Sequence, residues 1–332
     1  MSETAKTVPP RLHVLLKKKT AVVILRGNNK SVATFGWNLE DDSFVLGQWF
    51  RGRIYEYRSD LSPDGKHLIY FAAKYWRRDA VSQRMESALK EKFKTEDLWR
   101  VPDKLRRKAE EEINTTRREE FEKLQNSLEF SAPSWTAISR APYLKAIDLW
   151  WNGSGWNGGG AFLSERKVWL NHPPFMFNPP VLTSGKFSVT HDSIPELGYG
   201  NGHGECPSVY FPKLERDGWT FKGDSSRYLH YNVLFEKQLP DSRILQKRFL
   251  SGFNNIPGRS TYWEKHSIVD KAGTPILDGE AWTWADFDAP RERILFARDG
   301  CLWALPLREF DRAPVLLKDF NAVEFEQIIV PY

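Results

Sequence analysis

Short runs of apolar residues, alternating with polar ones and bounded by turn residues, make up most of the chain. Such runs predict β-strands, because side chains on a strand point alternately to its two faces. Before residue 80 the predicted strands are Leu12–Leu16, Ala21–Arg26, Val32–Trp37, Ser43–Phe50, Arg53–Arg58 and Leu68–Ala72. After residue 130 they are Trp135–Ser139, Lys145–Trp151, Arg166–Leu170, Trp219–Lys222, Tyr228–Phe235, Ile244–Phe249, Tyr262–Val269, Ala281–Phe287, Arg293–Ala297, Leu302–Pro306, Pro314–Leu317 and Phe325–Val330. The pattern indicates an all-β fold in which Pro173–Pro212, poor in periodicity, is expected to form a long loop region.

The segment from Ala80 to Glu129 breaks this pattern. It contains no glycine and one proline, Pro102, and its apolar residues recur every three or four positions, as on a helix with one apolar face. These residues are Met85, Leu89, Phe93, Leu105, Ala109, Ile113, Phe121, Leu124 and Leu128. Pro102 and Asp103 suit the first turn of a second helix. We expect a two-helix charged insertion, residues 80–129, with segments 1–79 and 130–332 forming one domain around it.

One stretch of the chain occurs twice. Asp60–Lys74, DLSPDGKHLIYFAAK, combines a Pro-Asp-Gly turn with a run of apolar residues, which predicts a tight turn entering a buried strand. Asp286–Arg298, DFDAPRERILFAR, repeats the order of aspartate, apolar residue, turn, charged residues and apolar run. Two copies of one strand unit, far apart in the chain, indicate a repeat architecture.

The SPDGK turn at Ser62–Lys66, followed by LIYFA, resembles the repeat of WD-like β-propellers of the Tol-system type, a bacterial group. Arg298–Leu305, RDGCLWAL, is similar to the next strand of such a blade. The resemblance implies a five- or six-bladed β-propeller-like domain, in which Asp64 and Gly65 have structural roles. In such a ring the N-terminal strands could pair with the last ones, leaving no open sheet edge. A β-sandwich with insertions is the alternative architecture.

Charge and composition narrow the functional classes. The net charge is +5, but the first 30 residues hold seven bases and one acid, while the rest of the chain holds 41 bases and 42 acids. A local cluster of this kind argues against a nucleic-acid partner, which usually needs a basic face across the fold. Two cysteines, no signal-peptide pattern and no apolar run of about 20 residues predict a cytoplasmic protein without a membrane span.

One cluster of side chains suits metal chemistry. His191, His203 and Cys206, with Asp192 and Glu205 nearby, provide nitrogen, sulfur and oxygen ligands of the kinds that zinc accepts. Their spacing matches no standard ligand motif, so an ordinary loop without metal or cofactor is the main expectation. Cys206 would act as a nucleophile only beside a base that lowers its pKa.

A second group of residues suits carbohydrate chemistry. Asp192 and Glu205 are the pair of carboxylates that a glycoside hydrolase would need across a pocket. Trp150, Trp151 and Trp156 lie in or beside the glycine-rich loop NGSGWNGGG. Exposed tryptophans stack on sugar faces or on a protein partner. We expect Trp150 and Trp151 to be buried at a strand end and Trp156, between glycines, to be exposed.

The chain contains no phosphate-binding loop, dinucleotide-binding motif, zinc-protease motif or nucleophile elbow. The charged helical segment, with 12 bases and 11 acids from Arg84 to Lys123, suits either a solvated face with ion pairs or an arm that binds a partner. We therefore expect a non-catalytic protein-binding module or scaffold, for instance an inhibitor or immunity-type protein that neutralises a toxin. The alternative is a carbohydrate-binding or glycoside-hydrolysing protein that uses Trp156, Asp192 and Glu205.

Overall fold

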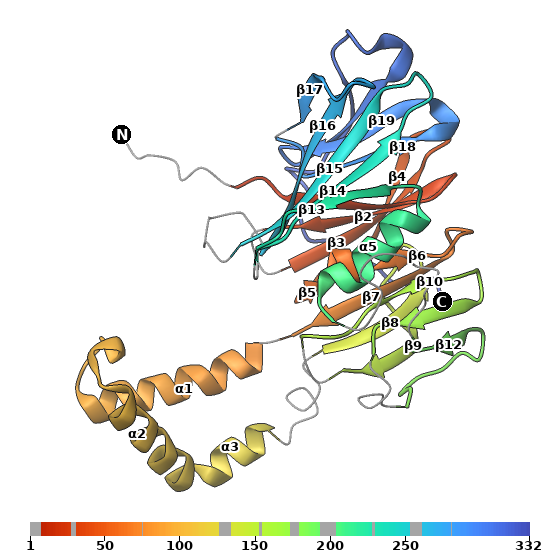
Figure 1. Ribbon diagram of the computed structural model, residues 1–332. Coiled ribbons are helices and arrows are strands. Elements are labelled where there is room, and N and C mark those ends of the chain that lie inside the picture. The colour runs from red at the N-terminus through yellow and green to blue at the C-terminus, as the bar shows by residue number, and fades with distance from the viewer. Residues whose placement is uncertain are drawn as a thin grey trace.

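The computed structural model describes residues 8–27, 31–74, 76–125, 134–152, 155–172, 179–192, 204–227, 230–252, 261–279 and 281–332. These residues form five sheets, nearly all antiparallel, and few helices (Figure 1). This mostly β architecture is consistent with a β-propeller-like fold. Each sheet uses strands that follow one another along the chain, as the close spacing of the predicted strands requires.

The first and fifth sheets are antiparallel meanders built from the two ends of the chain. The first contains β1 (Arg11–Leu16), β2 (Thr20–Arg26), β3 (Ser31–Asn38) and β4 (Ser43–Arg51). The fifth contains β18 (Trp284–Asp288), β19 (Arg293–Arg298), β20 (Cys301–Pro306) and β21 (Val315–Asp319), with the 3-10 turns η5 (Ala289–Arg291) and η6 (Leu307–Glu309). The predicted pairing of the N-terminal strands with the last strands is wrong, because each group pairs within its own sheet; β1 packs against β18 and β19 without joining them.

The second sheet contains the strands that lie before and after the helical insertion in the sequence. It contains β5 (Arg53–Ile54), β6 (Asp60–Leu61), β7 (His67–Ala73), β8 (Ser134–Arg140) and β9 (Ala146–Trp151). β7 and β8 pair directly, so the helices are inserted between two hydrogen-bonded neighbours. The strand predicted over Arg53–Arg58 is wrong beyond Ile54, where the chain forms the 3-10 turn η1 (Glu56–Arg58). All three residues of η1 are buried, so the alternation of apolar and polar residues there does not reflect a half-exposed strand.

The third and fourth sheets follow along the chain. The third contains β10 (Gly160–Phe162), β11 (Lys167–Leu170) and β12 (Ser188–Thr190), and β11 and β12 run parallel. The fourth contains β13 (Thr220–Asp224), β14 (Asn232–Gln238), β15 (Ile244–Ser251), β16 (Tyr262–Val269) and β17 (Pro275–Gly279). Strands β10, β12 and β17 were not predicted. The strand predicted at Phe325–Val330 is absent, and Phe325 and Ile329 face solvent there instead of a core.

A helix, α5 (Cys206–Arg216), occupies part of the region predicted as loop. It packs against η1, against β10 of the third sheet and against β13 of the fourth. Contacts between neighbouring sheets then continue from the fourth to the fifth, from the fifth to the first, from the first to the second and from the second to the third. The sheets therefore form a ring of contacts in which α5 stands between the third and fourth sheets, with Tyr210 and Phe211 in the largest hydrophobic core.

The two copies of the repeated stretch occupy equivalent places in separate sheets. Asp60 of β6 pairs with Ile69 of β7, and Asp286 of β18 pairs with Leu295 of β19, which is the same register in both copies. In the first copy, the turn closes through a hydrogen bond of 2.8 Å from the Gly65 amide to the Ser62 carbonyl. Gly65 has a φ of +73°, a left-handed conformation that favours glycine. The repeat thus marks corresponding positions within two sheets.

The helical insertion, which we call the arm, extends to one side of the sheets (Figure 1). It contains three helices rather than the predicted two: α1 (Trp76–Phe93), α2 (Asp103–Thr116) and α3 (Arg118–Gln125), with the 3-10 turn η2 (Leu98–Arg100). α2 begins at Asp103 directly after Pro102, as predicted. Leu105, assigned to the apolar face, is exposed, while Phe121, Leu124 and Leu128 have side chains outside the described residues. None of the described helices combines the length and apolar character needed to cross a membrane.

Candidate functional site

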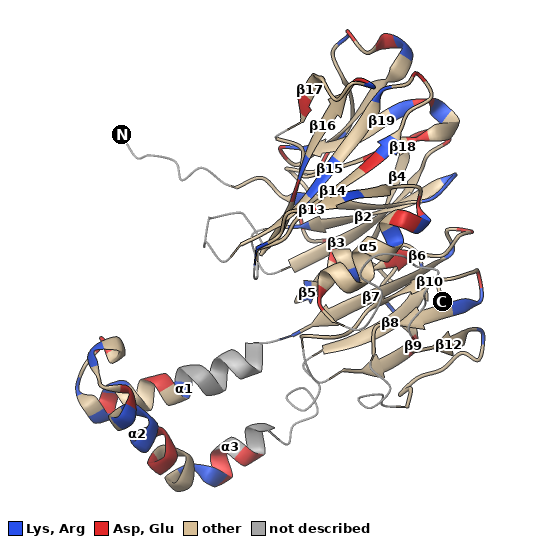
Figure 2. Cartoon of the chain, in the orientation of Figure 1, with Lys and Arg blue, Asp and Glu red and all other residues tan. Residues whose placement is uncertain are grey.

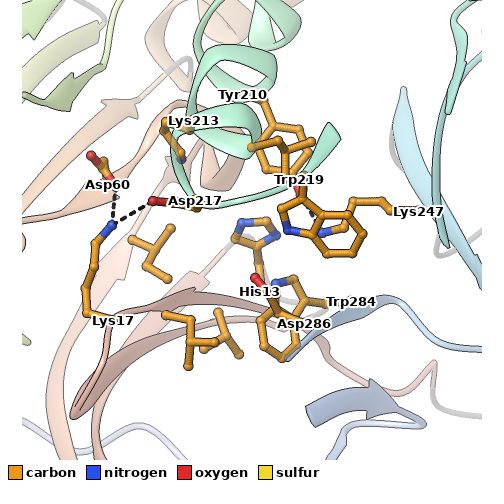
Figure 3. Close-up of a pocket in the computed structure, with 14 residues that line it drawn as sticks. His13, Lys17, Asp60, Tyr210, Lys213, Asp217, Trp219, Lys247, Trp284 and Asp286 are labelled. Atoms are coloured by element: carbon orange, nitrogen blue, oxygen red, sulfur yellow. Dashed lines mark hydrogen bonds and ion pairs between the residues drawn. The ribbon is translucent and has the colours of Figure 1, made fainter. Parts of the chain in front are cut away.

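A small polar cavity lies near the centre of the ring, where β1, β6, α5, β15 and β18 approach one another (Figure 3). The residues that line it with polar or aromatic groups are His13, Lys17, Asp60, Tyr210, Lys213, Asp217, Trp219, Lys247, Trp284 and Asp286. Asp60 and Asp286, the leading residues of the two repeat copies, both face this cavity. Its volume is about 30 Å³, which is room for a water molecule or a small ion.

Helix α5 brings its charged residues to this centre because most of its surface is buried. Cys206, Val209, Tyr210, Lys213 and Leu214 follow the spacing i, i+3, i+4, i+7 and i+8, and all five are buried. Pro207 lies in the first turn, where its missing amide leaves no helical hydrogen bond unmade. The side chain of Lys213 therefore projects from a helix face that is otherwise packed against the sheets.

Asp60 is the centre of the first charged group. Arg216 donates two hydrogen bonds to its carboxylate, of 2.6 and 3.0 Å, and Lys17 lies 3.6 Å away. Lys17 also lies 3.4 Å from Asp217, which accepts further bonds from Arg216. Burial alone would raise the pKa of Asp60, but Arg216 and Lys17 outweigh it and hold that pKa far below its ordinary value. Asp60 is therefore ionised and fully paired.

Glu264 is the centre of a second buried group. Tyr210 donates a hydrogen bond of 2.5 Å to Glu264, and Lys247 donates one of 2.9 Å to the Tyr210 hydroxyl. Lys247 and His266 lie 3.5 and 3.3 Å from the other carboxylate oxygen. Burial would raise the pKa of Glu264, but Lys247 foremost lowers it well below the ordinary value. Charges this deep persist because they are paired.

Lys213 differs from these groups because its hydrogen-bond acceptor is neutral. Its ammonium group is buried and donates to the backbone carbonyl of Ser59. Burial lowers the pKa of Lys213 from 10.5 to about 8, although Asp60 acts in the opposite direction. Burial likewise lowers the pKa of His13 to about 3, so this imidazole is neutral. The cavity thus combines one weakly compensated cation with a neutral ring.

The predicted tryptophans fall into two classes. Trp150 is buried in the core between the second and third sheets, and Trp151 is partly buried edge-to-face with Trp135. Trp156 is 61% exposed in the glycine-rich loop. The expectation from sequence is confirmed for Trp150 and Trp156, while Trp151 is only partly buried. Trp156 is the most exposed of the three.

The residues of the predicted metal and carboxylate sites lie in different surroundings. Asp192 is exposed, Glu205 accepts a hydrogen bond from Tyr262, and His203 lies outside the described residues. Arg58 donates to Cys206 Sγ over 3.3 Å, yet burial raises the pKa of the Cys206 thiol, which opposes a nucleophilic role. The described part of the chain contains no group of three or more His, Cys, Asp or Glu side chains placed to hold a metal ion.

The segments that carry Trp156 and Glu205 are linked at the end of β11. The Asn171 amide donates to the carbonyls of Gly158 and Gly204, joining the glycine-rich loop to the segment before α5. β11 and β12 run parallel, so their C-terminal ends, followed by Asn171 and Asp192 respectively, lie on the same side. Asn171 therefore joins the loop that carries Trp156 to the segment that carries Glu205, and Asp192 follows the strand beside β11.

The arm presents a different kind of surface. Ala88, Leu89, Ala109 and Ile113 form a small core between α1 and α2. Charged residues of both signs cover the outside (Figure 2), including ion pairs between Lys92 and Glu112 and between Arg84 and Glu120. At the far end, between α1 and α2, Trp99 is 73% exposed and the Arg100 guanidinium lies over its ring, 4.9 Å from the ring centre. Neither Trp99 nor Arg100 was singled out from sequence.

The charged residues around the cavity were also not predicted, although one feature of the sequence indicates two of them. Lys17, Asp60, Arg216 and Lys247 come from four separate segments, and nothing in their spacing indicates that they meet. The repeat, however, places an aspartate at the same position of each copy, Asp60 and Asp286. Both aspartates face the cavity, so the aspartate that begins each copy of the repeat is the residue from which the site could have been predicted.

Comparison with known proteins gives distant structural likenesses. No family model matches the chain, and no curated protein matches it. The β-propeller domain of the Trilobed protease from Pyrococcus furiosus aligns with 95% of this chain and 99% of its own, at 11% identity and a TM-score of 0.36. Hydrazine synthase from Kuenenia stuttgartiensis aligns over 92% and 79%, at 11% identity and a TM-score of 0.28. A protein from Listeria monocytogenes aligns over 92% and 64%, at 8% identity and a TM-score of 0.22. With TM-scores this low, neither fold nor activity is argued from these three proteins.

Proposed function

We propose that the protein is a non-catalytic binding module whose arm captures a protein partner. The observation that carries the proposal is the exposure of Trp99 at the far end of the arm. Tryptophan and arginine are enriched among the residues that dominate protein–protein affinity, and Trp99 and Arg100 stand side by side. Leu105, 52% exposed at the start of α2, adds apolar surface nearby in the sequence.

Packing within the arm supports the segment that carries Trp99 and Arg100. The core formed around Leu89 and Ile113 joins α1 to α2, and ion pairs between helices fix their relative position. An aromatic anchor on such a support loses little conformational entropy when it binds. Charged residues of both signs around the anchor favour a protein surface over a polyanion, because polyanion binding needs an excess of bases.

We infer that the five sheets are the blades of one WD-like β-propeller of the Tol-system type, with the arm inserted in its second blade. The equivalent registers of the two repeat copies and the ring of contacts support this inference. A propeller would act as a rigid scaffold for the arm. An inhibitor or immunity-type protein that blocks a toxin would use such an arrangement, and this remains an analogy at the level of fold.

The test compares Trp99→Ala with Trp156→Ala as bait in affinity capture from cells of the source organism, followed by binding measurements with the purified partner. Both residues are exposed tryptophans, so the two variants lose the same side chain. We expect Trp99→Ala to weaken binding by about tenfold or more, and Trp156→Ala to leave it unchanged. Equal binding by wild type and Trp99→Ala would refute the proposal.

A second candidate, carbohydrate binding or hydrolysis, rests on the link at the end of β11. Trp156 is exposed in one of the linked segments, Glu205 lies in the other, and Asp192 follows the strand beside β11. The experiment is a glycan-binding and hydrolysis screen with wild type, Asp192→Ala and Glu205→Ala. Sugar turnover that disappears in both variants, with partner capture unaffected, would favour this function over the first.

A further inference from the structure

Basic residues occupy neighbouring strand ends of the first and second sheets, where the arm begins. They are Arg11, Arg26, Arg51, Arg53 and Lys74, which we call the basic patch. Arg11, which begins β1, pairs with Arg26, which ends β2, and Arg51 ends β4 opposite the first residue of β3. Gly52 connects Arg51 to Arg53, which pairs with the last residue of β7, just before Lys74 and the arm (Figure 1).

The basic patch has little negative charge to balance it. Glu56 of η1 is the carboxylate that pairs with it, with one oxygen 4.0 Å from Nη1 of Arg26. The other four bases form no ion pair with a described residue. Burial would raise the pKa of Glu56, but Arg26, Arg11 and Arg53 lower it, so this one carboxylate is ionised and shared among several cations.

Three of the arginines are close enough to act on one another. Arg11 and Arg26 line one small cavity together with Glu56. Burial is the main reason that the pKa of Arg26 is lowered; Glu56 opposes this shift, and Arg53 and Arg11 add to it. An anion bound between these like charges would relieve their repulsion.

The patch also contains hydrogen-bond donors without acceptors. Nη1 of Arg26 and Nε of Arg53 are both buried and have no hydrogen-bond partner among the described residues. A buried donor that bonds neither to protein nor to water is destabilising. An acceptor supplied by a ligand would therefore be favoured at this place.

The chemistry of the patch suits a ligand with several carboxylates. Each guanidinium group offers parallel N–H donors that match the two oxygens of a carboxylate. Neighbouring strands lie about 4.8 Å apart, so the bases are spread over several strand ends and one small anion reaches only part of them. A polypeptide with several acidic side chains can meet more of them at once.

We propose that the basic patch is a docking surface for an acidic segment of a protein, held by Arg11, Arg26, Arg51 and Arg53. Single-stranded nucleic acid is a poorer fit, because its bases need free aromatic rings on which to stack. The ring of Tyr55 in this region is already covered, with the guanidinium carbons of Arg53 and Arg58 lying 4.4 and 4.9 Å from its centre. The surface lies where the arm begins, so it does not depend on Trp99 at the far end.

The test measures binding of a fluorescent octaglutamate peptide to the full chain by fluorescence anisotropy. We expect binding at about 20 mM salt and much weaker binding at about 200 mM, because salt screens exposed charges. The double variant Arg11→Gln, Arg53→Gln should bind about tenfold more weakly or worse. The control, Arg308→Gln with Arg312→Gln, removes the same charge from two exposed arginines elsewhere and should bind like wild type.

A second variant guards against misfolding of the first. Arg51 is exposed, so Arg51→Glu alters the surface alone and should also weaken peptide binding by about tenfold, whereas Arg308→Glu should not. Trp99→Ala should bind the peptide like wild type, which separates this surface from the arm. Undiminished peptide binding by both patch variants, or no binding by wild type at low salt, would refute the docking surface. Tighter binding of an octathymidylate strand than of octaglutamate would overturn its assignment to an acidic protein.

Discussion

Replacing Lys213 by methionine should make the protein more stable at neutral pH. Burial lowers the pKa of Lys213 from 10.5 to about 8. While the lysine stays protonated, this difference corresponds to roughly 3 kcal/mol of lost folding free energy. Methionine has a similar shape without the charge, but it leaves the Ser59 carbonyl without its donor, a loss of about 1–2 kcal/mol. The variant should therefore gain about 1–2 kcal/mol at pH 7.

The pH dependence of that gain gives the sharper test. The pKa of Lys213 is lower in the folded state than in the unfolded state, so the folded protein releases this proton first as the pH rises. Between about pH 8 and about pH 10.5 the unfolded chain binds more protons at this site, and wild type gains stability relative to the variant. The advantage of Lys213→Met should be complete below about pH 8, should shrink as the pH rises, and should become a loss of about 1–2 kcal/mol above about pH 10.5, where only the missing bond to Ser59 remains.

The assay is urea unfolding followed by tryptophan fluorescence across this pH range, with the difference in unfolding free energy between variant and wild type as the readout. The charged groups around Lys213 are common to both proteins; they are Lys17, Asp60, Arg216 and Asp217. Lys271→Met, at an exposed turn, should differ from wild type by less than about 0.5 kcal/mol at every pH. A difference between Lys213→Met and wild type that stays constant with pH would refute the reasoning.

Three further predictions concern the other buried charges and the arm. Asp60→Asn removes the buried carboxylate that pairs with both Arg216 and Lys17 and leaves them only Asp217, so urea unfolding should show a loss of about 3–5 kcal/mol, against less than about 0.5 kcal/mol for the exposed Asp311→Asn; a small loss at Asp60 would contradict the pairing. Glu264 has a folded pKa below its ordinary value of 4.5, so it contributes stability that is present above that pH and is lost as the pH falls; the difference between wild type and Glu264→Gln should shrink below about pH 4.5, and a constant difference would count against it. Ile113→Ala should lower the protection of arm amides in hydrogen exchange by about 2–4 kcal/mol without changing the sheets; equal losses in the sheets would show that the arm is not an independent unit.

The sequence predicts most of the strands because their signals are local. Short apolar runs mark β1 and β2, and β16 alternates between buried and partly exposed residues; the boundaries of all three agree with the predicted ranges to within one residue. The Ser62–Lys66 turn is specified by its own side chains, since Ser62 donates to Asp64 over 2.6 Å and accepts a hydrogen bond from the His67 amide. Features of this kind need no information from distant parts of the chain.

The helix α5 could not be predicted in the same way. It contains Pro207 and Pro212, and Pro212 in the helix interior removes a hydrogen bond that an isolated helix would need. Packing of Tyr210, Phe211 and Leu214 against the fourth and fifth sheets stabilises it instead. Tertiary burial of this kind overrides intrinsic propensity and is not visible in local composition.

The candidate site residues likewise differ in whether local sequence features could predict them. Exposure of Trp156 was predicted from its glycine neighbours, whereas Trp99 is a candidate only because α1 and α2 turn at the far end of the arm. Lys17 and Asp217 lie 200 positions apart in the chain yet are joined by an ion pair. Contacts across such separations depend on how the sheets are arranged, so the sequence alone could not group these residues.

The repeat links the fold to the chemistry at its centre. In both copies the leading aspartate, Asp60 or Asp286, stands on a strand that faces the cavity, and the register of the following strand is the same. The same unit therefore brings a carboxylate to the centre from two different sheets, and each carboxylate needs a cation nearby. Lys17 and Arg216 supply it for Asp60, and Lys237 supplies it for Asp286. Lys213 is a further cation beside this pair of aspartates, and because burial lowers its pKa, it destabilises the folded state while it is protonated.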